Sequence, residues 1–331
     1  MNGWGVGRDD VEAVAWFRKA ADQGLADGQS YLGAMYANGR GVMRDDVEAV
    51  ALYRRAADQG LALAQSNLGF MYESGRGTAR DDAQAVAWYR KAADQGLAVG
   101  QGRLGWMYAT GRGVMQDFDQ AVAWSRKAAD QGNAIGQSNL GVAYRNGHGV
   151  AQDDAQAVIW FRKAADQGFA FAQANLGSLY ENGRGVMQDN AQAVAWYRKG
   201  ADQGLALAQT SLGVMYATGR GVARDDAQAV AWYRKGANQG LAFAQINLGF
   251  MYDKGRGVTR DDAQAVAWYR KAADQGNADA QANLGGMYAN GRGVARDYSQ
   301  AVAWYRKAAD HGLVRAQNAL RAMTRQGRSF R

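Results

Sequence analysis

Residues Ala62 to Leu97 read ALAQSNLGFMYESGRGTARDDAQAVAWYRKAADQGL, and closely similar stretches recur every 36 residues along the chain. A fixed period of this length is typical of a solenoid built from small helical units, because no single unit can bury its apolar face alone. The pattern therefore predicts an all-α chain, an α/α solenoid of 36-residue helix-turn-helix repeats.

The period organises all 331 residues into one array. A solenoid grows by adding units, so we expect a single elongated domain over residues 1–331 rather than two globular ones. Its expected parts are a half repeat at 1–25, eight full repeats over 26–313, a final helix at 314–323 and a basic tail at 324–331.

Each repeat is expected to contain two helices, here called helix A and helix B. In the stretch above, helix A runs over about residues 62–73 and ends before Gly75, since glycine tolerates the left-handed backbone of a helix end. Helix B begins after Asp81, with Gln84 three residues later, which is the capping-box pattern. It ends at Gly96.

Helical spacing assigns one side of each helix to the core. Gln65 lies on that side in all nine copies, and a buried amide needs partners, so we expect it to bridge backbone groups between units. The other expected core positions are Leu68, Gly69 and Tyr72 on helix A, with Ala85, Trp88, Tyr89, Ala92 and Ala93 on helix B.

Composition argues against enzyme chemistry and against a cofactor. The chain has no Cys and two His, and His148 and His311 are isolated substitutions in the repeat pattern. The aspartates recur at caps and helix ends, one set per unit, as parts of a scaffold do. We therefore predict no catalytic residue, no metal site and no cofactor.

The sequence contains no apolar run of membrane-spanning length, and residues 1–25 do not form a secretory signal. The chain as written is thus expected in the cytoplasm. Met1 falls in the middle of a unit, so a periplasmic or secreted location stays open if the N-terminus is truncated.

The repeat resembles the Sel-1-like repeat family, a relative of tetratricopeptide repeats. The resemblance lies in the spacing A-x-A-Q-x-x-L-G-x-M-Y-x-x-G-x-G-V-x-x-D-x-x-x-A-V-x-W-Y-x-K-A-A-x-Q-G and covers nearly the whole chain. It implies a right-handed superhelix that binds proteins or peptides, often as an adaptor in bacteria. A cysteine-rich subgroup of the family includes proteins that bind or hydrolyse β-lactams, which leaves a β-lactam or cell-wall related enzyme as a remote alternative.

Positions that vary between copies are where a partner would be recognised. On helix A they form a stripe through Leu63, Asn67, Phe70 and Ser74, which faces away from the core side. By resemblance to tetratricopeptide arrays, this stripe lies on a concave surface. The apolar candidates for partner binding are Phe70, Trp106, Val142, Val214 and Phe250 in one column, with Phe171 and Phe243 in the Leu63 column. The alternative is that the Leu63 column packs against the preceding helix B.

A polar column lies between these two. Asparagine amides offer both a donor and an acceptor to an extended peptide. The alternative is a solvated or locally bonded residue of the repeat pattern. The candidates are Asn67, Arg103, Asn139, Asn175, Asn247 and Asn283.

A third column contains loop arginines, interrupted by His148. A row of guanidinium groups suits phosphates or carboxylates. Each loop also carries aspartates such as Asp81 and Asp82, however, and their local neutralisation favours a solvated edge. The column consists of Arg40, Arg76, Arg112, Arg184, Arg220, Arg256 and Arg292.

These features favour a non-catalytic scaffold or adaptor that holds a protein or peptide segment on the helix-A surface. The alternative is a polyanion-binding module that uses the loop arginines and the basic tail. The formal net charge is +8, but four arginines lie in the last eleven residues and the array itself is only mildly basic. We therefore expect no nucleic-acid partner, and we expect a monomer without a membrane span.

Overall fold

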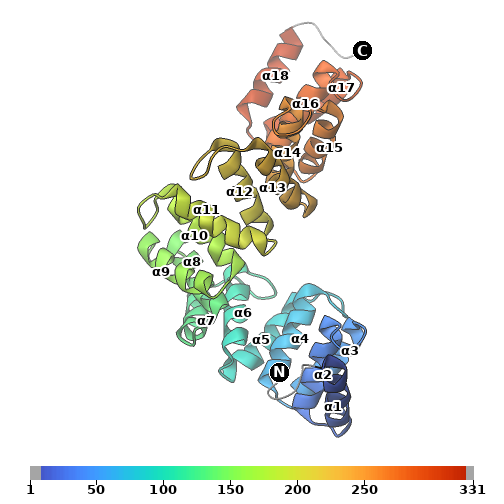
Figure 1. Ribbon diagram of the computed structural model, residues 1–331, viewed down its shortest axis with the longest axis vertical. Helices are drawn as coiled ribbons and strands as arrows, with labels where there is room; N and C mark the ends of the chain where they lie inside the picture. Colours follow the sequence, from blue (N-terminus) through green and yellow to red (C-terminus); the bar gives the residue numbers. More distant parts are fainter. Residues whose placement is uncertain (1–8, 326–331) are drawn as a thin grey trace. The chain divides into compact units, whose positions relative to one another are not determined.

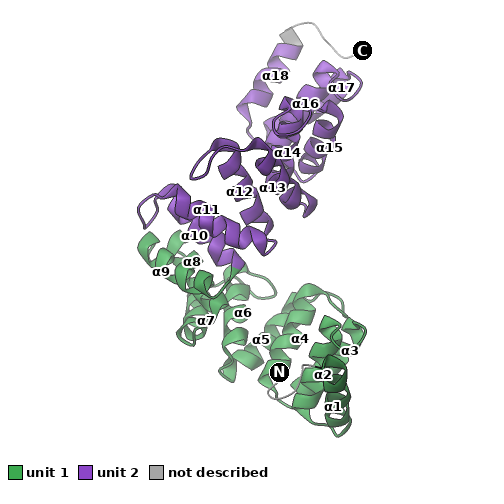
Figure 2. Cartoon of the chain, in the orientation of Figure 1, with its two compact units in different colours: residues 1–169 green, residues 170–331 purple. Residues whose placement is uncertain are grey.

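The computed structural model describes residues 9–325, and over that range the chain forms eighteen α-helices joined by short turns (Figure 1). Each full repeat supplies one helix A and one helix B, so the all-α solenoid of 36-residue repeats is confirmed. The chain separates into two compact units, residues 1–169 and 170–331 (Figure 2).

The first unit contains nine helices within its described part. Helices with odd numbers are B helices, and those with even numbers are A helices. They are α1 (Asp10–Asp22), α2 (Ala26–Asn38), α3 (Asp46–Asp58), α4 (Ala62–Ser74), α5 (Asp82–Asp94), α6 (Ala98–Thr110), α7 (Phe118–Asp130), α8 (Ala134–Asn146) and α9 (Asp154–Asp166).

The second unit begins with an A helix and ends with one. Its described helices are α10 (Ala170–Asn182), α11 (Asn190–Asp202), α12 (Ala206–Thr218), α13 (Asp226–Asn238), α14 (Ala242–Lys254), α15 (Asp262–Ala273), α16 (Ala278–Asn290), α17 (Tyr298–Asp310) and α18 (Val314–Arg325). The last helix is two residues longer than expected, and residues 326–331 of the expected basic tail lie outside the described residues.

The start of helix B is capped as the sequence predicts, but by half of the capping box. The Asp81 carboxylate accepts a hydrogen bond from the Gln84 backbone N–H at 2.9 Å. The Asp81 N–H, which a full box would give to the Gln84 side chain, donates to the Tyr72 carbonyl at 3.0 Å. That bond ties the end of helix A to the start of helix B, so the turn itself satisfies the donor.

Helix A ends one residue later than expected, at Ser74, where Gly75 adopts a left-handed conformation with φ of 68°. The second loop glycine has a different role. A Cβ on Gly77 would lie 2.0 Å from the Asp46 carbonyl oxygen, so only glycine allows the loop to touch α3 of the preceding repeat. The glycines of this turn therefore set both the helix end and the stacking of neighbouring repeats.

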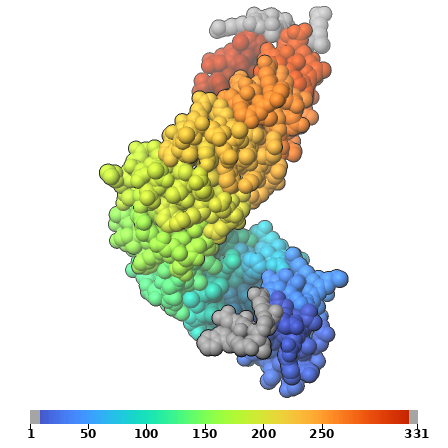
Figure 3. All heavy atoms as spheres, in the orientation of Figure 1, coloured from blue at the N-terminus to red at the C-terminus, as the bar shows by residue number. Residues whose placement is uncertain are grey.

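The core lies between helix A and helix B of each repeat and between neighbouring repeats. Leu68 and Tyr89 are completely buried, and Met71 is 1% exposed. Trp88 is only half-buried, and the Lys91 ammonium lies 3.9 Å from its ring centroid. Side chains fill the spaces that the ribbon leaves open between adjacent helices (Figure 3).

The buried glutamine column joins A helices to the B helices on either side, as Gln65 shows. The Gln65 amide donates to the Ala57 carbonyl of the preceding repeat at 3.2 Å, which confirms the expected backbone bond. Its oxygen accepts from the Gln95 side chain at 2.8 Å, where a second backbone group was expected. These two hydrogen bonds therefore satisfy the side chain of Gln65, a residue that is only 4% exposed.

Candidate partner-binding surface

The Leu63 column lies on the surface of the A helices. Leu63 and Val99 of the first unit are 42% and 39% exposed. In the second unit, Phe171, Leu207 and Phe243 are 42%, 45% and 55% exposed. These side chains stand at the first turn of each helix A, two positions before the buried glutamine. These side chains present apolar area to solvent. If the column packed against the preceding helix B, as the alternative interpretation of the sequence has it, that area would be buried.

The Phe70 column is less exposed. Phe250 is 38% exposed, whereas Phe70, Trp106, Val142 and Val214 are half-buried. Phe70 packs against the core cluster between α3 and α4 and against the one between α5 and α6, where Trp106 also packs. Single substitutions in this column therefore alter both the surface and the packing beneath it.

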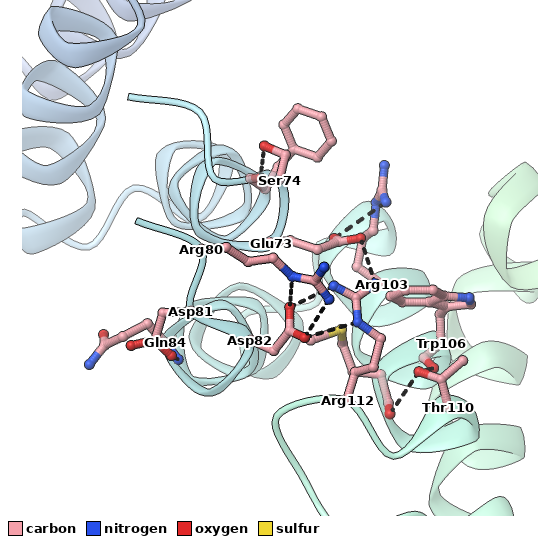
Figure 4. A network of polar contacts seen from close by, with 12 residues as sticks. Glu73, Ser74, Arg80, Asp81, Asp82, Gln84, Arg103, Trp106, Thr110 and Arg112 are labelled. Atoms are coloured by element: carbon pink, nitrogen blue, oxygen red, sulfur yellow. Dashed lines mark hydrogen bonds and ion pairs between the residues drawn. The ribbon is translucent and has the colours of Figure 1, made fainter. Parts of the chain in front are cut away.

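A polar network that includes Glu73, Arg103 and Arg112 lies beside Trp106 (Figure 4) and extends to Phe70. The Arg103 guanidinium lies 5.3 Å from the Phe70 ring centroid, and that of Arg112 lies 4.7 Å from the Trp106 centroid. Glu73, 11% exposed in its side chain, is 3.4 Å from Arg103 and 3.9 Å from Arg112. Sequence reasoning missed Glu73, although it stands three residues after Phe70, one helical turn along the same face.

The Asn column does not act as a uniform row of free amides. Asn139 donates to the Gly102 carbonyl of the preceding A helix at 2.9 Å, and Asn175 is buried and donates to the Phe171 carbonyl at 2.8 Å. Asn247 differs, because its buried amide nitrogen has no hydrogen-bond partner. Asn67 and Asn283 are half-buried.

The loop arginines hold successive repeats together. The Arg76 guanidinium forms two hydrogen bonds with the Asp46 carboxylate, thirty residues earlier, the shorter of 2.6 Å, and also donates to the Ala37 carbonyl at 2.5 Å. The aspartate is the first residue of helix B in the preceding repeat, whereas the sequence analysis expected neutralisation by aspartates of the same loop, such as Asp81 and Asp82. Pairs of this kind include Arg40–Asp10, Arg76–Asp46, Arg112–Asp82, Arg256–Asp226 and Arg292–Asp262.

Two repeat boundaries depart from this pairing, one at both positions and the other at the aspartate position alone. His148 replaces the loop arginine where Phe118 replaces the aspartate, and their rings stack with centroids 4.2 Å apart. Asn190 replaces the aspartate opposite Arg220, which instead forms an ion pair with Glu181 at 2.6 Å. Paired replacement at positions thirty residues apart is the sequence signal that could have revealed the contact.

The arginines also change the acidity of their partners. The pKa of Asp46 is lowered to about 2, chiefly by hydrogen bonds from Arg76 and then Arg44. Hydrogen bonds from Arg292 and Arg260 lower the pKa of Asp262 to about 2 in the same way. These carboxylates are therefore ionised at neutral pH, and much of the positive charge of the loop column is neutralised by the fold itself.

Within 9–325, no group of three or more His, Asp or Glu side chains is placed to hold a metal ion. In the same range, no helix combines the length and apolarity that crossing a bilayer requires.

Comparison with protein families identifies the repeat. The Sel1 repeat matches nine consecutive segments that together cover residues 1–313, with the boundaries expected from the period. The chain belongs to the Sel1 repeat family. A search of curated proteins found no match.

Two solved Sel1-type structures resemble this Sel1 repeat chain over most of its length. A protective antigen present in uropathogenic Escherichia coli strains is 40% identical, with a TM-score of 0.68, over 95% of this chain and 67% of the antigen. A Sel1 repeat protein from Oxalobacter formigenes is 36% identical, with a TM-score of 0.63, over 97% of this chain and 98% of the other.

Proposed function

We propose that this Sel1 repeat protein is a non-catalytic scaffold that binds a peptide or protein segment along the exposed face of its A helices. The observation that carries the proposal is the exposed apolar column that includes Leu63, Phe171, Leu207 and Phe243. Within each unit, exposed apolar side chains at the same position of successive repeats suit a partner laid across neighbouring A helices. The second column adds aromatic anchors of the kind that dominate binding energy, Trp106 and Phe250 among them.

The unpaired amide of Asn247 supports the same surface. Asn247 lies one helical turn after Phe243 and three residues before Phe250, between two exposed rings. A buried donor without a partner costs about 1–3 kcal/mol, which a peptide carbonyl would recover where binding displaces a neighbouring ring and exposes the nitrogen. We therefore expect apolar anchoring and a backbone contact to be combined at this position when a peptide is bound.

The loop arginines do not support polyanion binding in the same way. Five of them form ion pairs with helix-B aspartates at 2.6–2.7 Å, and Arg220 forms one with Glu181. An arginine that already binds a carboxylate bidentately would have to break that contact to meet a phosphate. We therefore favour the peptide-binding surface.

The test is selection of displayed random peptides on the full-length chain, followed by affinity measurements with the peptides recovered. Changing Phe70 and Trp106 together to Ala, or Phe243 and Phe250 together, should weaken binding at least about tenfold if these are anchors. The control is Ile159→Ala, since Ile159 is 45% exposed but lies on a helix B. Circular dichroism should show unchanged helicity, and binding that survives both double changes would rule out the helix-A surface.

A further inference from the structure

Arg103 departs from the repeat pattern at the centre of the aromatic pair. Its column carries asparagine in both flanking repeats, at Asn67 and Asn139, and a small polar residue at Ser211. The Arg103 side chain is 30% exposed and lies over Phe70 with its charge beside Glu73. An arginine thus stands on the proposed binding face, between Phe70 and Trp106.

The guanidinium of Arg103 has unused hydrogen-bonding capacity. An arginine carries five N–H donors. Arg103 makes one hydrogen bond in the structure, from Nη1 to Glu73 Oε2, and at 3.4 Å it is long for a charge-assisted contact. The same carboxylate oxygen already accepts the Tyr89 hydroxyl at 2.6 Å. Glu73 therefore positions Arg103 without saturating it.

The charges of the ion-paired side chains around Arg103 also do not cancel. Ion pairs link Arg80, Asp82, Arg112, Glu73 and Arg103 in one chain (Figure 4). That chain contains three cations and two anions, an excess of one positive charge. The equivalent glutamate in the second unit, Glu181, receives the Tyr197 hydroxyl and pairs with Arg220 alone, with Ser211 at the position of Arg103.

We infer that Arg103 recognises an acidic side chain of the bound segment, an Asp or Glu flanked by apolar residues that contact Phe70 and Trp106. The inference rests on the proposed peptide-binding function and assigns a partner chemistry to one place on that surface. Charge complementarity carries it, because Arg103 presents a partly exposed positive charge between aromatic side chains and is held in place by the Phe70 ring and the Glu73 carboxylate. A side chain ordered before binding loses little further entropy when the ligand arrives.

The experiment uses peptides selected from a random displayed library on the full-length protein. Each selected peptide that contains Asp or Glu is synthesised with its Asn or Gln twin, and both dissociation constants are measured by fluorescence anisotropy. We expect the acidic peptide to bind about tenfold more tightly or better, as a charge-assisted hydrogen bond would give. Arg103→Asn, which installs the residue of the flanking repeats, should reduce that ratio to near one.

The control is Arg55→Gln, which removes the same charge from an exposed position on a helix B and should leave the ratio unchanged. Equal affinities of the twins for the unchanged protein, or a ratio that survives Arg103→Asn, would overturn the inference while leaving peptide binding intact. If Arg103→Asn lowers the melting temperature but leaves the affinity ratio of the twins unchanged, Arg103 serves only as the counter-ion of Glu73. That outcome also overturns the inference. Failure of any peptide to bind would reject the proposed function itself.

Discussion

Gly69 lies where α4 passes closest to α5. A Cβ at this position would lie 2.8 Å from two atoms of the Tyr89 ring and 3.2 Å from the Ala85 carbonyl oxygen. Tyr89 is completely buried, so its ring has no free space into which to move. The pairing of a glycine on helix A with an aromatic ring on helix B therefore fixes the separation of the two helices in the repeat.

Replacing Gly69 with alanine should consequently destabilise the protein, although alanine is the better helix former. We expect a loss of about 1–3 kcal/mol from overpacking, measured by urea unfolding monitored by circular dichroism. The matched control is Gly286→Ala, whose Cβ would meet only the Tyr305 hydroxyl at 3.4 Å. The control should be neutral or stabilising by up to about 1 kcal/mol, as propensity predicts. Equal effects of the two changes would contradict the packing argument.

At this scale the sequence predicted the positions better than their partners. Gly69, Gln65 and Asp81 were assigned correctly because helical spacing and capping rules are local. The ion pair of Arg76 with Asp46 was not predicted, because a contact between residues thirty positions apart depends on how one repeat stacks on the next. For the same reason, the contacts of Glu73 with Arg103 and Arg112 of the next repeat were not predicted.

At the scale of elements, the stacking of one repeat on the next depends on the arginine that follows helix A. Arg76 binds both the first residue of α3, Asp46, and the last turn of α2 at the Ala37 carbonyl. One guanidinium thus donates both to the negatively charged Asp46 side chain and to the Ala37 carbonyl, which has no partner within its own helix.

The acid sensitivity of the fold should follow from these pairs. The pKa values of Asp46 and Asp262 are lowered to about 2. A lowered carboxyl pKa contributes stability that is fully present above the ordinary value near 4 and is lost as pH falls toward 2. We expect the unfolding midpoint in urea to fall over this window. The double change Asp46→Asn and Asp262→Asn should make that fall shallower, with asparagine chosen because Asn190 occupies the same position naturally. An unchanged slope would contradict the role of these pairs.

The His148–Phe118 stack allows the coupling across one repeat boundary to be tested directly. Changing Phe118 to Asp alone should destabilise the fold, because the stack is lost and His148 cannot pair bidentately. Adding His148→Arg should recover stability by restoring the pair found at the other boundaries. A double-mutant cycle in urea unfolding is expected to give a coupling energy of about 0.5–3 kcal/mol. Additive effects would mean that the two side chains do not interact.

Helix boundaries were predicted within two residues, since glycines and aspartates mark the end of each helix A and the start of each helix B. Exposure was harder to predict. The Leu63 column is exposed, but Asn139 and Asn175 of the neighbouring polar column bond to backbone carbonyls. Whether a half-buried amide faces a neighbour or a partner depends on the distance between adjacent A helices, which the repeat pattern does not specify.

At the scale of the whole molecule, helices within each compact unit contact chiefly the helices next to them in the chain. A structure of this kind is stabilised by repeats and by the interfaces between neighbouring repeats, without one central core. Destabilisation is then expected to remain local, because few contacts transmit it beyond the adjacent repeat.

Hydrogen exchange of Gly69→Ala should show this directly. We expect faster amide exchange in α4 and α5 and, to a smaller extent, in the neighbouring α3 and α6. Helices α13 to α17 should exchange at their unchanged rates, because their packing depends on contacts such as Gly249 against Tyr269 and on ion pairs such as Arg292–Asp262. The reciprocal variant Gly249→Ala, whose Cβ would meet the Tyr269 ring at 2.9 Å, should accelerate exchange in α14 and α15 while leaving α3 to α6 protected. A uniform acceleration along the chain in either variant would show all-or-none unfolding and contradict nearest-neighbour stabilisation.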